Sequence, residues 1–155
     1  MITIATLDDG ERRALEAALD DEYKSHATYA QVIRDFGPIR PFINIVDAEA
    51  RHVAALLAIF DNHGLAAPSD RWTNSVPRFA SVHAACVASI QGEIENIALY
   101  DRVLASTRRP DLLTVYEALR AASQERHLPA FRRCAERGPR GGADRTHGVD
   151  GSKSP

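Results

Sequence analysis

The chain has 155 residues, of which 45% are hydrophobic, and its formal net charge is -2. This length and composition fit one domain with a sizeable apolar core, and the weak charge argues against binding to nucleic acid or to an anionic membrane surface. The longest apolar run, from about Val53 to Phe60, is far shorter than the roughly 20 residues of a membrane-spanning helix. Met1 to Glu11 lack the basic start and apolar stretch of a secretory signal, so we expect a cytoplasmic protein.

Apolar residues recur three and four positions apart over long stretches, whereas alternating runs of β-branched residues are scarce. This pattern predicts an all-α fold. Asp8 with Glu11 resembles a capping box, and the prolines at 41 and 110 suit the first turn of a helix. The four predicted helices run from Thr6 or Asp8 to Phe36, from Pro41 to Gly64, from about Arg78 to Ser106, and from Pro110 to about Arg137.

The connections between these helices predict their arrangement. Only a few residues join the first helix to the second and the third to the fourth, so each pair should form an antiparallel hairpin. The linker from Leu65 to Pro77 could extend over roughly 40 Å. A helix of 23 residues is about 35 Å long, so the linker can run the length of the molecule. We therefore expect an antiparallel four-helix bundle over residues 1–137, with one long crossover between helices 2 and 3; a simple up-down bundle is the alternative. Residues 138–155 lack an apolar period and should form a disordered tail.

The first two predicted helices carry acidic and imidazole side chains on their apolar faces. At about 100° per residue, Glu22, His26 and Tyr29 fall on the apolar stripe of the first helix. Glu49 and His52 fall on the apolar stripe of the second helix. Their E-x-x-H spacing places an oxygen and a nitrogen ligand on one helix face, as metal sites in helix bundles require.

The third predicted helix offers two acidic candidates. Glu93 and Glu95 lie about 200° apart around the helix, so only one of them can face the core. The apolar stripe of this helix selects Glu93. Glu93 precedes Tyr100 by seven residues, as Glu22 precedes Tyr29. The residues that we assign to the stripe are Val87, Ile90, Ile94, Ile97 and Leu104.

The fourth predicted helix carries His127 without a carboxylate three residues before it. Position 124 is Gln, a weak neutral ligand, and Glu125 lies about 160° around the helix from His127. This helix should therefore supply a single ligand. On the third helix, His83 and Asp101 also point inward, and we expect them to make hydrogen bonds in the core.

Glu22, Glu49 and Glu93 would place three acidic side chains in one core. Burying an ionised carboxylate in an apolar interior costs several kcal/mol unless it is compensated. No inward Lys or Arg is clearly paired with these residues, so a metal cation is the simpler compensation. The alternative is a salt bridge from Arg126, near the core edge of the fourth helix, which would give a metal-free core.

Together these residues resemble the ferritin-like superfamily, and most closely small rubrerythrin-related bacterial proteins of unknown function, in which a His also follows the helix-1 Glu by one turn. The resemblance covers about residues 12–135. It rests on Glu22 with Tyr29, Glu49 with His52, Glu93 with Tyr100, His127, and the segments Ala48 to His52, Pro110-Asp111 leading to Val115 to Glu117, and His127 to Phe131.

The resemblance implies an oxidoreductase with a carboxylate-bridged pair of iron or manganese ions that reacts with dioxygen or peroxide. Glu22 and Glu93 would be terminal or bridging ligands and Glu49 a bridging ligand. His52 and His127 would supply nitrogen ligands. Carboxylates and imidazoles suit zinc as well.

Four further residues would surround these ligands. Tyr29 and Tyr100 would tune them by hydrogen bonds, and His26 and Gln124 would lie beside them or act as further ligands. No C-x-x-C pair is present, so the iron–sulfur domain of many rubrerythrins is lacking and the electron donor would be another molecule. The bundle could also form a homodimer.

Two alternatives stay open at this point. The helix-4 position that lacks a Glu also fits a metal-free or single-metal bundle that acts as a binding or interaction module. Cys86 and Cys134 are predicted to be buried free thiols on inward faces, although they could pair under oxidation, and the separation of their Cα atoms would decide between the two states.

Overall fold

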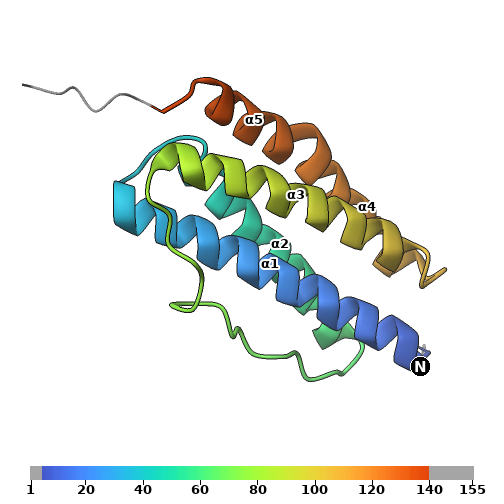
Figure 1. Cartoon of the computed structure of the whole chain (residues 1–155). Coiled ribbons are helices and arrows are strands. Elements are labelled where there is room, and N and C mark those ends of the chain that lie inside the picture. The colour runs from blue at the N-terminus through green and yellow to red at the C-terminus, as the bar shows by residue number, and fades with distance from the viewer. Residues whose placement is uncertain (1–4, 140–155) are drawn as a thin grey trace, which may run out of the picture.

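The computed structural model describes residues 5–139, and the regular secondary structure of this part of the chain is all helical, with no strand. The prediction of an all-α fold is confirmed. Three helices come before the last helical rod, which is divided by a short π-helical turn (Figure 1). The elements are α1 (Asp9–Phe36), α2 (Phe42–Asn62), α3 (Val82–Leu104), α4 (Pro110–Ala122), η1 (Ser123–His127) and α5 (Leu128–Glu136).

The helices lie side by side along a common direction (Figure 1). α1 packs against α2 and α3, while α3 also packs against α4, η1 and α5. α2 turns back along α1, and the segment 63–81 then returns along the molecule, so α3 begins at the end where α1 finishes (Figure 1). The last rod, α4 to α5, turns back along α3.

The ends of the helices follow from local side-chain chemistry. Asp8 caps α1 in a capping box with Glu11, as the sequence predicts. Gly37, at φ 89°, ends α1 in a conformation that favours glycine. α3 begins at Val82 rather than near Arg78, because the side chain of Ser81 accepts a hydrogen bond from the backbone of Ala84 and fixes the first turn there.

The segment 63–81 is held against α1 by polar contacts. Asp20 of α1 accepts two hydrogen bonds of 2.8 Å from Arg71 and one of 3.1 Å from the indole of Trp72. The side chains of Arg71 and Lys24 also lie over the Trp72 ring, 4.4 and 5.2 Å from its centroid. At the other end of α1, Asp35 pairs with Arg78. These contacts fix the path of the long connection.

Two apolar clusters fill the interior, and a polar layer separates them. Along each helix the buried apolar residues stop at the level of Glu22, Glu49, Glu93 and His127 and then resume. One cluster holds Leu7, Leu15, Ala18, Leu19, Leu56, Ile59, Phe60, Tyr100, Val103, Leu112, Tyr116 and Leu119. The other holds Tyr29, Val32, Phe42, Ile45, Ala85, Cys86, Phe131 and Cys134.

The sequence predicts only some of the residues on the inward face of α3. Val87 and Ile94, assigned to the core stripe, are 49% and 40% exposed. Asp101, expected to bond within the core, is exposed and pairs with Arg120 at 2.6 Å. His83 is half-buried, and its Nδ1 has no hydrogen-bond partner among the described residues. The inward face of α3 is instead Ala85, Cys86, Ser89, Glu93, Asn96, Tyr100 and Val103.

The prediction that Cys86 and Cys134 are free thiols is wrong. The structure joins them in a disulfide between α3 and α5, with the Cα atoms 6.0 Å apart. The two helices pack together with their cysteines on buried faces, at a separation usual for a disulfide.

Two predictions about the rest of the chain have different outcomes. None of the described helices combines the length and the hydropathy that crossing a membrane requires. The predicted disordered tail, residues 138–155, falls almost wholly in residues 140–155, outside the described part of the chain.

A buried ion pair ties the start of α1 to the turn between α3 and α4. Glu11 is 5% exposed and accepts hydrogen bonds from Thr107 at 2.5 Å and from Arg109 Nε at 3.0 Å. Burial raises the pKa of Glu11, but the bonds from Thr107, Asp8 and Arg109 outweigh burial and lower it below 4.5.

Removing one partner of this pair should therefore destabilise the fold. We expect Arg109→Ala to lower the free energy of unfolding by about 2 kcal/mol, because Glu11 loses a charged hydrogen-bond donor. The neighbouring exposed Arg108, changed to Ala, is the control of equal charge. Urea unfolding at neutral pH measures both variants, and equal losses would contradict the assignment. Because the folded-state pKa of Glu11 is depressed, the stability it contributes is present above about pH 4.5 and is lost as the pH falls through the lower, folded-state value.

Candidate metal centre

Five ionisable side chains meet in the polar layer between the two apolar clusters. They come from every long rod: Glu22 from α1, Glu49 and His52 from α2, Glu93 from α3, and His127 from η1. All five are buried, with at most 8% of each residue exposed. The structure thus brings together the five residues that the sequence predicts as ligands.

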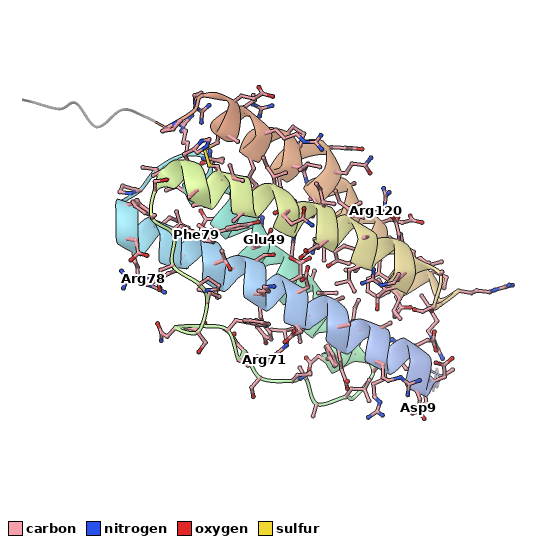
Figure 2. All side chains as sticks on the ribbon, in the orientation of Figure 1. Asp9, Glu49, Arg71, Arg78, Phe79 and Arg120 are labelled. Carbon is pink, nitrogen blue, oxygen red and sulfur yellow. A yellow bond between two sulfur atoms is a disulfide. The ribbon has the colours of Figure 1, made fainter. Side chains whose placement is uncertain are left out.

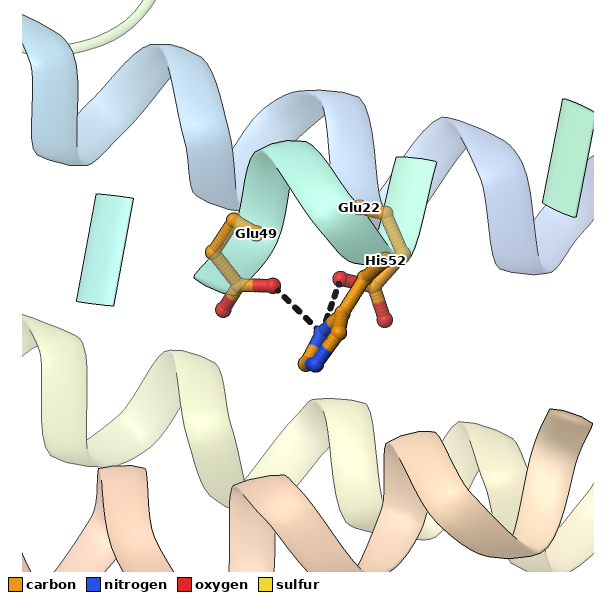
Figure 3. A group of neighbouring side chains, drawn as sticks. All are labelled: Glu22, Glu49 and His52. Atoms are coloured by element: carbon orange, nitrogen blue, oxygen red, sulfur yellow. Dashed lines mark hydrogen bonds and ion pairs between the residues drawn. The ribbon is translucent and has the colours of Figure 1, made fainter. Parts of the chain in front are cut away.

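These side chains form two overlapping groups that share Glu49. Glu22, Glu49 and His52 offer ligand atoms within 4.8 Å of one another, and so do Glu49, Glu93 and His127. Figure 3 shows the first group, in which both carboxylates point toward the His52 ring. Glu49 lies near the centre of the molecule, where the four rods meet (Figure 2).

In each group the Nδ1 atom of the imidazole faces two carboxylates. His52 Nδ1 lies 2.9 Å from Glu49 Oε2 and 3.4 Å from Glu22 Oε2. His127 Nδ1 lies 3.3 Å from Glu49 Oε1 and 3.6 Å from Glu93 Oε1. The two imidazole rings stack with their centroids 5.5 Å apart. The two oxygens of Glu49 therefore divide between the two histidines.

Several ligand atoms in this layer lack a hydrogen-bond partner within the described chain: Glu22 Oε2, Glu93 Oε2 and His127 Nδ1. A buried polar atom without a hydrogen bond is costly, and such atoms are rare in folded proteins. The three unpartnered atoms are all oxygens or nitrogens of the kind that bind a metal ion. They belong to both groups, so each group has unused ligand capacity.

The pKa values of the layer show which groups hold protons, and so balance the negative charge of the carboxylates, when no metal ion is bound. Burial, followed by the charge of Glu49, raises the pKa of Glu22 to about 7. Burial raises the pKa of Glu49 too, but its close contacts with His127 and His52 outweigh burial and lower that pKa below its usual value.

For the two histidines, burial lowers the pKa and the nearby carboxylates raise it. Burial lowers the pKa of His52, but its contacts with Glu22 and Glu49 outweigh burial and raise the pKa to about 10. Contacts with Glu49 and Glu93 likewise outweigh burial and raise the pKa of His127 to about 9. Two imidazolium ions can thus balance much of the negative charge in the absence of metal.

Two tyrosines hold the outer carboxylates in a reciprocal arrangement. Tyr29 of α1 donates a hydrogen bond of 2.6 Å to Glu93 of α3, and Tyr100 of α3 donates one of 2.5 Å to Glu22 of α1. Because α1 and α3 run in opposite directions, the seven-residue spacing in both helices places each tyrosine level with the other helix's glutamate. Burial, followed by the charge of the bonded glutamate, raises the pKa of both tyrosines well above 10, so they stay protonated donors.

A hydrogen-bonded chain that the sequence did not predict closes the side of the layer next to Glu22. The Asn96 amide donates to Asp21 at 2.7 Å and to Glu22 at 3.3 Å, and its oxygen accepts a bond of 2.7 Å from Ser123. Burial raises the pKa of Asp21 to about 6, against the effect of the Asn96 bond. The signal for Asn96 was its position three residues after Glu93, on the same helix face.

Ser123 faces the layer, whereas Gln124 and Arg126 are exposed, and Gln124 bonds to Arg120 at 2.5 Å. Helical spacing already places Ser123 on the inward face, four residues after the buried Leu119. The last rod then makes the π turn η1, in which Leu128 donates its backbone hydrogen bond to Ser123, five residues back. The signal in the sequence was Pro129, which has no N–H to continue the α-helical pattern.

The structure does not place Gln124 at the layer, and it does not show the alternative salt bridge from Arg126. Gln124 is neither a ligand nor a neighbour of the ligands. Arg126 does not pair with the buried carboxylates, because it lies on the exposed face of η1. His26 is half-buried and belongs to neither ligand group in the described part of the chain.

Comparisons with known proteins support the fold but no activity. No protein-family model and no curated protein sequence matches this chain. The solved structure of hypothetical protein MJ0754 from Methanococcus jannaschii matches with a TM-score of 0.78 and 18% identity, over 88% of this chain and 86% of that chain. The conserved hypothetical protein rv2844 from Mycobacterium tuberculosis matches with a TM-score of 0.73 and 14% identity, over 84% and 93%. Similarity at this level extends to the fold alone.

The Asn96 chain gives a test of the layer that needs no metal. We expect Asn96→Ala to lower the free energy of unfolding of chelator-treated protein by about 3 kcal/mol, because Asp21, Glu22 and Ser123 each lose a buried hydrogen-bond partner. Asn44→Ala, at an exposed position of α2, is the matched control and should change stability by less than about 0.5 kcal/mol. Denaturant unfolding followed by circular dichroism measures both, and similar values for the two variants would refute a structural role for Asn96.

Proposed function

We propose that this protein is a ferritin-like carboxylate metalloprotein that binds iron or manganese between its helices and acts as an oxidoreductase on dioxygen or peroxide. In this proposal the four rods form an antiparallel four-helix bundle, and the segment 63–81 is its long crossover. The single observation that carries the proposal is the pair of buried ligand groups that share Glu49.

The donor set supports a metal of this class. Each group offers carboxylate oxygens and one imidazole nitrogen, a combination that suits iron, manganese and zinc. Glu49 would bridge, because each of its oxygens already faces a different histidine. Glu22 with His52 and Glu93 with His127 would complete the two positions. A bound redox metal would supply electrons for reducing the oxidant.

The surroundings of the ligands favour such chemistry. Tyr29 and Tyr100 hold the outer glutamates in place through hydrogen bonds to one oxygen of each. The apolar clusters on either side exclude water from the layer. Tyr29 also lines a pocket of about 220 Å³ between α1, α3 and the segment 63–81, with Asp21, Ser89 and Gly92. A small oxidant could approach Glu93 from this pocket.

One observation favours a second candidate, a bundle with one metal or none. Position 124, where a helix-4 carboxylate would be expected three residues before His127, is an exposed Gln, and the neighbouring Ser123 bonds to Asn96. The raised pKa values of His52 and His127 also allow protons to balance the carboxylates. In that case the protein would serve as a binding or interaction module.

Metal content distinguishes these candidates. We expect full-length protein from cells supplemented with iron or manganese to hold between about one and two metal ions per chain, and less than about 0.2 per chain would contradict the proposal. Glu49→Ala should abolish binding because Glu49 belongs to both groups, whereas Glu22→Ala should lose only part of the metal. Gln124→Ala, at an exposed position of η1, is the control and should bind as the wild type does.

Oxidant consumption tests the redox part separately. Protein loaded with Fe²⁺ without oxygen should consume dioxygen or hydrogen peroxide faster than the same concentration of free Fe²⁺, as measured with an oxygen electrode or a peroxide assay. The Glu49→Ala variant should not exceed the free ion. If the loaded wild type is no faster than free Fe²⁺, the protein binds metal without the proposed activity.

A further inference from the structure

The disulfide lies at the end of the molecule where α3 begins, away from the carboxylate layer. Figure 2 shows its sulfur–sulfur bond at this end. Cys86 and Cys134 are the only cysteines of the chain. Each is seven residues from a predicted ligand, Glu93 and His127 respectively, so about two helical turns separate the disulfide from the layer.

A pocket of about 720 Å³ opens beside the disulfide at this end. Cys134 is among its lining residues, whereas Cys86 is not and is fully buried. Cys134 therefore borders a space large enough for a small molecule, whereas Cys86 is shielded. The remaining lining residues are Phe36, Ile39, Arg40, Ala80, Ser81, Val82, His83, Arg137, Gly138 and Pro139.

The charge of this pocket has one sign. Arg40 and Arg137 line it, and no carboxylate is among its described lining residues. The nearest acidic side chain of the α1 end, Asp35, is already paired with Arg78. A cationic pocket beside a disulfide favours the approach of an anionic molecule.

A histidine, His83, lies on the face of α3 that carries Cys86. It precedes Cys86 by three residues in α3, which places the two side chains on neighbouring positions of one helix face. It also lines the pocket, and its Nδ1 has no hydrogen-bond partner among the described residues. A histidine in this position can protonate a thiolate as it leaves Cys86.

We propose that the Cys86–Cys134 disulfide is a reducible redox site that exchanges with small anionic thiols bound in this pocket. The thiolate attacks Cys134 Sγ, forms a mixed disulfide, and breaks the bond to Cys86, whose sulfur takes the electron pair and then a proton from His83 or water. A second thiolate attacks the small-molecule sulfur of the mixed disulfide and releases Cys134, which is protonated in turn. Two small thiols are thereby oxidised to one disulfide while the protein disulfide is reduced to two thiols.

This exchange uses no metal, so it stands or falls independently of the proposed metal centre. Metal content and oxidant consumption measure that centre, whereas the state of the two cysteines is measured by mass spectrometry after trapping of free thiols. The experiments below use the full-length, chelator-treated wild type.

Three thiols of similar size and different charge test the pocket: 2-mercaptoethanesulfonate, 2-mercaptoethanol and cysteamine. At low salt and equal thiolate concentration, we expect the anion to reduce the native disulfide at least about fivefold faster than the cation, with the neutral thiol between them. Added salt should shrink the difference. The proposal is overturned if the three rates are equal, or if each rate levels off at the rate of global unfolding, because the disulfide then reacts only in unfolded protein.

A matched pair of double variants tests the two arginines. Arg40→Gln with Arg137→Gln should remove most of the anion's advantage, while Arg51→Gln with Arg108→Gln, at exposed positions outside the pocket, changes net charge equally and should preserve it. If both double variants behave alike, the preference reflects net charge rather than the pocket.

Single cysteine variants test which sulfur is attacked. Cys134 in Cys86→Ser should react with an anionic aromatic disulfide reagent at least about tenfold faster than Cys86 in Cys134→Ser. Equal or reversed rates would contradict attack at Cys134. Because the thiol series is measured on the wild type, the proposal can be tested even if one variant folds poorly.

Discussion

The interior of this protein is organised around three carboxylates that are buried together. Glu22, Glu49 and Glu93 are each at most 2% exposed, and an ionised carboxylate in an apolar interior costs several kcal/mol unless a cation or a hydrogen bond compensates. The two histidines contact these carboxylates, and Tyr29, Tyr100 and Asn96 donate hydrogen bonds to them. The carboxylates therefore explain why each rod interrupts its apolar face at the same level.

Two reciprocal hydrogen bonds between α1 and α3 fix the relative height of these two helices. Tyr29 bonds to Glu93, and Tyr100 bonds to Glu22, so sliding one helix along the other by a turn would break both bonds at once. Such a slide would also leave two glutamates and two hydroxyls buried without partners, at about 1–3 kcal/mol for each group. The polar layer thus specifies the register that apolar packing alone would leave loosely defined.

The sequence predicts most of α1 and α2 because their inward faces follow the helical period. On these helices the apolar stripe and the ligand candidates coincide, so Glu22, Glu49 and His52 are found from spacing alone. On α3 the same reasoning selects Glu93 but assigns Val87 wrongly to the core, because the true inward face is largely polar. A search for apolar residues cannot detect a face built from Ser, Glu and Asn. The pairing of the cysteines could not be predicted for a related reason, since it depends on the height of α5 against α3 and not on either helix by itself.

Two contacts of different chemistry fix the height of the last rod against α3. The disulfide joins α5 to α3 at one end, and the bond from Ser123 to Asn96 joins η1 to α3 within the layer. His127 lies between these two points, at the end of the π turn, and is buried. Only the first point is covalent, and a reductant can break it, while the second depends on a buried hydrogen bond that a reductant leaves intact. In the reduced protein the position of His127 would therefore depend on the bond between Ser123 and Asn96 and on the packing of Phe131, so the polar layer itself would hold this histidine in place.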